Sequence, residues 1–149
     1  MAGKTFFVAD THFGHEAMIR FENRPFENTK DMERQLIKNW NETVDSEDRV
    51  YVLGDFAFGD KAEVTRLCRS LNGKKILVLG NHDTQSPEWY RECGFEEASP
   101  WPIIIEGFWI LSHEPLYINA VSYTHLDVYK RQVSTAHTTL LIPEIHRLQ

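Results

Sequence analysis

The sequence predicts an α/β fold with parallel strands at the centre of its sheet and antiparallel strands later in the chain. Two observations predict it. Three short apolar runs, each of which stops abruptly, are separated by two segments whose apolar residues recur at helical spacing. A hairpin pattern follows the last run. The order strand, helix, strand, helix, strand and hairpin is typical of an α/β sheet.

The first strand and the first helix have clear limits. Residues 5–9 (TFFVA) form a buried-strand pattern that stops at Asp10, and a polar, His-rich loop follows over 10–16. Asn28 or Thr29 can cap the helix after it. The apolar residues of that helix recur at helical spacing: Met32, Leu36, Ile37, Trp40 and Val44.

The next strand and helix follow the same plan. Residues 49–53 (RVYVL) read as a second buried strand, ended by Gly54 and Asp55. The helix after it is terminated by Asn72 and Gly73. Its apolar face steps through Val64, Leu67, Cys68 and Leu71.

The last elements are a third strand over 75–79 (KILVL), a short helix and a hairpin. The helix can start at Ser86-Pro87 and close at Gly94. Ranges 103–105 and 108–112, joined by Glu106-Gly107, read as the hairpin, and His113 stands just beyond it.

Length and charge limit the possible functions. The 149 residues suit one compact domain or slightly less than one larger one. A formal net charge of −6 argues against a surface that binds duplex DNA, although it does not exclude a nucleic-acid partner. The charge is compatible with a phosphate substrate, because bound cations can reverse the sign of a local pocket. No apolar run resembles a signal peptide or spans a bilayer, so we expect a cytoplasmic protein without membrane contact. Cys68 and Cys93 are expected to be buried thiols. The sequence carries no signal for a particular oligomeric state.

Four short motifs carry the chemistry, and each directly follows an apolar run. They are Asp10-Thr11-His12, Gly54-Asp55, Gly80-Asn81-His82-Asp83 and Ser112-His113. In extended backbone, side chains two residues apart point to one side, so the first carboxylate and imidazole could chelate one ion. Ligands sit beyond the carboxyl ends of strands in open α/β sheets.

Each of these motifs alone has an ordinary explanation. Asp10 can cap the turn after it, Gly54-Asp55 is a common turn dipeptide, and a lone His113 is more often structural. His82, however, adds nothing to a turn. Together, at successive strand ends, the motifs indicate a metal site, and oxygen and imidazole ligands without thiolate suit Mn, Fe or Zn.

The set D-x-H, G-D, G-N-H-D and a later strand-ending His resembles the calcineurin-like metallophosphoesterase family, over residues 4 to 116 approximately. The segments 9–15 (ADTHFGH), 24–26 (RPF) and 39–41 (NWN) look like a small bacterial and phage branch of it. The resemblance implies a mixed β-sheet sandwich flanked by helices, in the layer order αββα.

The resemblance also implies a site with two divalent metal ions. Asp10 and His12 would bind the first ion, Asp55 would bridge both, and Asn81 and His113 would bind the second. His82 would sit beside the substrate as a catalytic residue. The implied reaction is hydrolysis of a phosphomonoester or phosphodiester by a hydroxide that the two ions activate.

Three further residues of the site have two readings each. His15 and Arg24 could grip the substrate phosphate or only anchor their loop. Asp83 could act in catalysis by orienting His82, or merely finish the turn. The family often carries an acidic residue three positions after the one that matches Asp55, and here that position is Phe58.

The family pattern breaks toward the C-terminus. The family supplies a G-H-x-H segment after the residue that matches His113, and this chain contains none. Residues 121–132 (VSYTHLDVYKRQ) look like the translated inverted repeat of a transposon end used in sequencing libraries, and an ordinary loop is the alternative. We therefore expect an incomplete metallophosphoesterase domain over 1–120, an adaptor artefact over 121–132 and an unrelated tail over 133–149.

Two functions are compatible with these residues. The first is a metal-dependent phosphoesterase acting on a small phosphate ester. The second is a non-catalytic metal- or phosphate-binding domain of the same fold, because loss of the G-H-x-H ligands would weaken the hold on both ions.

Overall fold

The computed structural model describes residues 3–107, 109–116 and 132–133. Its centre is a four-stranded sheet in the order β1-β2-β3-β4, and every neighbouring pair is parallel. The strands are β1 (Thr5–Val8), β2 (Arg49–Leu53), β3 (Lys74–Val78) and β4 (Glu97–Ser99). Because all four run the same way, their carboxyl ends lie at one edge of the sheet.

Four helices connect or follow these strands: α1 (Glu16–Phe21), α2 (Thr29–Thr43), α3 (Lys61–Ser70) and α4 (Pro87–Cys93). The side chains of Asn28 and Ser86 cap α2 and α4 by accepting backbone N–H groups. Asp60 and Glu63 form a reciprocal capping box at α3. None of the described helices is long and apolar enough to cross a membrane.

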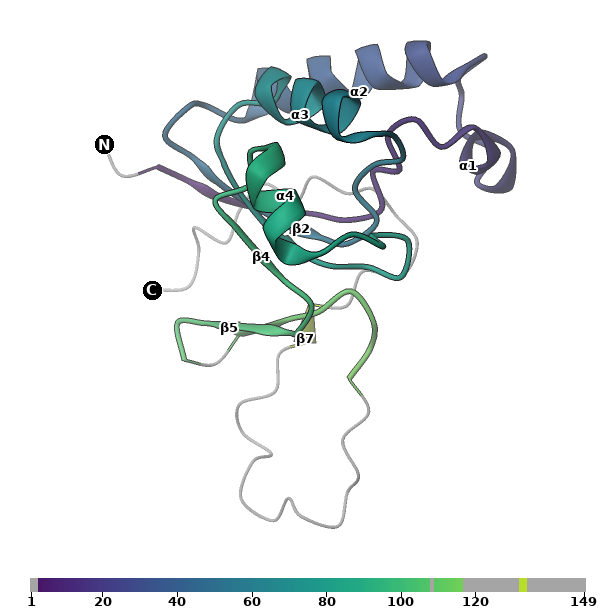
Figure 1. The fold of residues 1–149 in the computed structure, drawn as a ribbon. Coiled ribbons are helices and arrows are strands. Elements are labelled where there is room, and N and C mark those ends of the chain that lie inside the picture. Colours follow the sequence, from purple (N-terminus) through teal and green to yellow (C-terminus); the bar gives the residue numbers. More distant parts are fainter. Residues whose placement is uncertain (1–2, 108, 117–131, 134–149) are drawn as a thin grey trace.

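A second sheet lies on the side of the four-stranded sheet opposite to α2, α3 and α4 (Figure 1). Strands β5 (Ile103–Ile105) and β6 (Trp109–Leu111) pair antiparallel, and β7 (Gln132–Val133) pairs parallel with β6. In Figure 1, α2, α3 and α4 lie on one side of the four-stranded sheet, and β5 and β7 lie on the opposite side.

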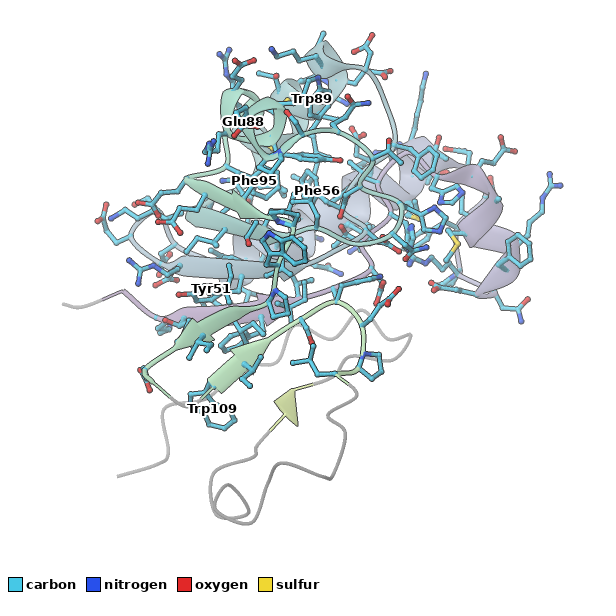
Figure 2. All side chains as sticks on the ribbon, turned by 60° about the horizontal axis from the view of Figure 1, so that its bottom comes forward. Tyr51, Phe56, Glu88, Trp89, Phe95 and Trp109 are labelled. Carbon is cyan, nitrogen blue, oxygen red and sulfur yellow. The ribbon has the colours of Figure 1, made fainter. Side chains whose placement is uncertain are left out.

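Both faces of the parallel sheet are buried, as the continuous apolar runs predict. Alternate residues such as Val50 and Val52 face the helices, where Phe56 and Phe95 meet edge to face, 4.9 Å between ring centroids (Figure 2). Tyr51 and Leu53 face the second sheet and pack with Leu111 of β6. The described layers are therefore helix, sheet and sheet.

The structure confirms the predicted α/β architecture, with a parallel sheet flanked by helices and an antiparallel hairpin after it. The described residues include no outer helix layer, so that part of the expected order αββα stays a prediction. Residues 117–131 and 134–149 lie outside the part of the chain that the structure describes, and the expected division of the chain near residue 120 stays a prediction.

Three short elements were missed: α1, β4 and the two-residue strand β7. Helix α1 lies in a stretch for which no helix was predicted, and it buries none of its residues, so it leaves no apolar periodicity to find. Strand β4 has three residues, Glu97, Ala98 and Ser99, and only Ala98 is buried and apolar. The predicted burial of the thiols of Cys68 and Cys93 is confirmed.

Candidate metal centre

The residues singled out in the sequence meet at the carboxyl edge of the parallel sheet. The loop after β1 runs beside the loop after β2, because the amides of Asp10 and His12 donate to the carbonyls of Gly54 (3.1 Å) and Asp55 (2.9 Å). The pairing extends to Phe13 and Phe56 at 3.0 Å. Two ligand-bearing loops are thus held in register beyond the ends of their strands.

Asp10, His12 and Asp55 form a buried cluster whose ligand atoms all lie within 4.8 Å of one another. Nε2 of His12 is 3.9 Å from Oδ1 of Asp10 and 3.5 Å from Oδ2 of Asp55. All three residues are at most 6% exposed. Two carboxylates confined this closely repel each other, and a cation between them removes the repulsion.

The backbone of this cluster is strained at its three principal residues. Asp10, His12 and Asp55 have φ values of 53°, 48° and 55°, in the left-handed region that residues other than glycine rarely occupy. This corrects one expectation. Asp10 and His12 do point to one site, but through left-handed turns and not through extended backbone. Such strain persists only where surrounding contacts impose it.

Arg24 supplies one of those contacts. Its guanidinium donates from Nη2 to the carbonyl of Asp10 (2.8 Å) and from Nη1 to that of Thr11 (2.9 Å). Nε donates to Glu22 at 2.7 Å, and the side chain is 10% exposed. These contacts match the anchoring alternative for Arg24. The phosphate-binding alternative stays a prediction, and no described contact favours it.

Asp83 ties the loop after β3 to the loop after β2. Its carboxylate accepts the backbone N–H groups of Asp55 (2.7 Å), Phe56 (3.1 Å) and Gly80 (2.8 Å). In return, Oδ1 of Asp55 accepts the N–H of His82 at 2.9 Å. Burial raises the pKa of Asp83, and the three N–H donors oppose that rise. The carboxylate holds the backbone of the bridging candidate Asp55, a contact that neither sequence reading of Asp83 included.

Two glycines allow the loops to approach this closely. Gly54 has φ +86°, and a Cβ there would collide with the ring of His113 and with Gly80. A Cβ on Gly80 would collide with the carboxylate and the amide of Asp55. The first glycine is therefore needed for both its conformation and its small size, and the second for its small size alone.

His113, beyond the end of β6, closes the cluster from the second sheet. Its Nδ1 lies 2.9 Å from the carbonyl of Leu53, which can only accept, so Nδ1 carries a proton. Nε2 then faces two oxygens, Oδ1 of Asn81 at 2.9 Å and Oδ2 of Asp55 at 3.6 Å. In proteins a metal-binding histidine commonly donates its other N–H to a backbone carbonyl, as His113 does here.

The remaining predicted residues lie at the rim. Nδ1 of His15 is 3.3 Å from Nδ1 of His12, and the ring of His82 lies 5.6 Å from both histidine rings. Phe58, which no sequence argument assigned to the site, stacks on His15 at 4.1 Å between centroids. Its only sequence signal was its place three residues after Asp55.

His12 and His15 are held in their neutral form. Burial lowers the pKa of His12 to about 4, although Asp55 opposes that shift, so the imidazole is neutral at pH 7 and offers a lone pair. Burial and the neighbouring His82 also lower the pKa of His15.

The residues present fit a site for divalent metal ions. The donor set is oxygen and imidazole without sulfur, which suits Mn, Fe or Zn. Asp10, His12 and Asp55 would hold one ion. Beside this group, Oδ2 of Asp55 lies 3.5 Å from Nε2 of His12 and 3.6 Å from Nε2 of His113, and the latter atom is 2.9 Å from Oδ1 of Asn81.

Comparison with known proteins agrees with this geometry. The model of the calcineurin-like phosphoesterase family matches residues 3–141, so the chain belongs to that family. All nine residues predicted for the site fall within the match, and their individual roles stay predictions.

The relatives are similar in sequence over part of their length. Uncharacterized protein MJ1445 of Methanocaldococcus jannaschii is 45% identical over 82 residues, 54% of this chain and 47% of that protein. The gene 66 protein of Mycobacterium phage D29 is 38% identical over 101 residues, 66% of this chain and 49% of its own length. The chain thus spans about half the length of these curated relatives.

A solved structure has a similar fold. The crystal structure of the protein of unknown function AQ665 from Aquifex aeolicus superposes on this chain with a TM-score of 0.60 at 35% sequence identity. The similarity covers 74% of this chain and 60% of that one.

Proposed function

We propose that the chain belongs to a metal-dependent phosphoesterase that hydrolyses a small phosphomonoester or phosphodiester, and that it carries side chains that bind the metal. The buried cluster of Asp10, His12 and Asp55 carries the proposal, since its ligand atoms lie within 4.8 Å of one another at the carboxyl edge of the sheet. Two divalent cations, when bound, would polarise the phosphoryl group and lower the pKa of an attacking water.

The chain's own residues have distinct parts in this proposal. Asp55 would hold both ions in register, because its Oδ2 lies near the imidazoles of both His12 and His113. Its other oxygen is fixed by the N–H of His82, so the carboxylate cannot rotate freely. His82, which is exposed at the rim, would stabilise charge on the phosphoryl group or give a proton to the leaving oxygen.

His15 would act as a neutral hydrogen-bond donor to the substrate phosphate. If Nε2 of His12 holds a cation, Nδ1 of His12 carries the proton and donates to Nδ1 of His15 across 3.3 Å. The proton of His15 then resides on Nε2, and a donor there suits a phosphate oxygen.

One experiment tests the proposal. The 149-residue chain is titrated with Mn²⁺ by calorimetry and assayed on 4-nitrophenyl phosphate and bis(4-nitrophenyl) phosphate, as wild type, Asp55→Asn and Asp45→Asn. Asp45 lies exposed in the loop between α2 and β2, so its variant is the matched control. We expect Asp55→Asn to lose Mn²⁺ binding and turnover and Asp45→Asn to retain both. Turnover that Asp55→Asn leaves unchanged would defeat the proposal.

A second candidate is a non-catalytic metal- or phosphate-binding domain. The absence of a G-H-x-H segment from the sequence favours it, since that segment adds a ligand to each ion in the family. Mn²⁺ binding that depends on Asp55, without turnover of either ester, would decide for this candidate.

A further inference from the structure

Three aromatic side chains lie close together at the rim of the cluster formed by Asp10, His12 and Asp55. His15 and Phe58 stack with ring centroids 4.1 Å apart and an interplanar angle of 25°. His82 meets both of them, at 5.6 Å from His15 and 5.9 Å from Phe58. The three rings belong to the loops after β1, β2 and β3, which also carry the proposed ligands.

This aromatic group differs from the cluster beneath it in exposure. Asp10, His12 and Asp55 are buried, whereas Phe58 is 46% exposed and His82 is exposed. Exposing a phenyl ring to water is unfavourable in free energy, and a planar apolar partner stacked on the ring would remove that cost.

We infer that Phe58 and His15 form a leaving-group subsite that takes a planar aromatic group attached to the phosphate. The inference rests on the proposed function, because it names the class of ester that the same site accepts. The phosphate would lie at the metal cluster, next to His82, and the aromatic ring would stack on Phe58. Phe58 is then a specificity-determining residue, in addition to holding the ring of His15.

The test measures binding of two non-hydrolysable phosphonates, so that it needs no turnover. Phenylphosphonate and methylphosphonate are titrated by calorimetry into the Zn²⁺-loaded chain as wild type, Phe58→Leu, Phe58→Tyr and Phe21→Leu. Phe21 of α1 is 82% exposed and makes no described contact with the site, so it is the matched control.

We expect the wild type to bind phenylphosphonate more tightly than methylphosphonate, and Phe58→Leu to reduce that preference by about 2- to 10-fold. Phe58→Tyr and Phe21→Leu should keep it. Equal binding of the two phosphonates by wild type, or an unchanged preference in Phe58→Leu, would overturn the subsite and leave the phosphoesterase proposal intact. An equal loss for both phosphonates in Phe58→Leu would also overturn it, since Phe58 would then act only by positioning His15.

Failure of the proposed function has a different signature. It would appear as ester turnover independent of Asp55, while a phenyl preference that requires Phe58 would still support the aromatic subsite.

Discussion

The substitution Asp83→Asn tests whether a single buried carboxylate ties the ligand loops together. One Asp83 oxygen accepts the N–H groups of Asp55 (2.7 Å) and Gly80 (2.8 Å), and the other accepts that of Phe56 at 3.1 Å. Asparagine keeps one acceptor and turns the other into a donor. At least one buried N–H would therefore face another N–H.

The expected loss follows from those contacts. A hydrogen bond to a charged group contributes about 1.5–3 kcal/mol, and leaving a buried donor unpaired costs about 1–3 kcal/mol. We expect Asp83→Asn to lower the free energy of unfolding by about 2–4 kcal/mol. Affinity for Mn²⁺ should also fall, by about 10- to 100-fold, because the backbone of Asp55 loses its support.

The assay is urea unfolding of the metal-free protein at pH 7, followed by tryptophan fluorescence, with calorimetric titration of Mn²⁺ in parallel. Asp45→Asn makes the same chemical change on an exposed loop and should stay within about 0.5 kcal/mol of wild type. A loss below about 1 kcal/mol for Asp83→Asn, with Mn²⁺ affinity unchanged, would show that Asp83 does not tie the loops together.

Three further predictions concern the same loops. Gly54→Ala should lower the free energy of unfolding by more than the roughly 1–2 kcal/mol cost of an alanine in the left-handed region, because its methyl group would collide with the imidazole of His113. Gly107→Ala, at φ +74° with open space around it, should show only the backbone cost in the same urea assay. Arg24→Lys should weaken Mn²⁺ binding about 10-fold, since one ammonium cannot replace the forked contacts with two carbonyls, and Arg20→Lys, whose side chain is 84% exposed, should not; equal calorimetric affinities for the two variants would contradict this. The pKa of His12 is about 4 in the folded protein and 6.5 in the unfolded chain, so between these pH values the unfolded state binds more protons. The free energy of unfolding of the metal-free protein should therefore rise by at most about 3 kcal/mol from pH 4 to 6.5, and His12→Gln should lose that rise. Parallel curves of stability against pH for the two proteins would contradict this.

The ligand positions could be predicted from sequence because each one follows a buried strand directly. The runs that became β1 and β2 are apolar after their first residue, and the run that became β3 is apolar after its first two, so the strands and their ends could be recognised. Parallel strands bring those ends to one edge. Asp10, Asp55 and Asn81 therefore had to lie near one another once the α/β order was recognised.

The manner in which the ligands are held could not be predicted, because it depends on contacts distant in the chain. The left-handed φ of Asp10 has no signal in an Asp-Thr-His triplet. The contacts of Arg24 with backbone carbonyls 13 and 14 residues earlier carry no side-chain pattern. The bond between His113 and the carbonyl of Leu53 joins two sheets across 60 residues.

Phe58 could not be assigned to the site from the sequence, because its only signal is its place three residues after Asp55. Its stacking on His15 depends on the backbone hydrogen bonds from Asp10 and His12, which bring the loop after β1 beside the loop after β2.

The two-ion site is tested most directly by an anomalous difference map, recorded at the manganese absorption edge from crystals of the chain grown with Mn²⁺. We predict a peak within coordination distance of Asp10, His12 and Asp55, and a second peak beside Asn81 and His113 that shares Asp55 with the first. A well-ordered cluster of these side chains without any manganese peak among them would contradict a metal centre at this edge of the sheet.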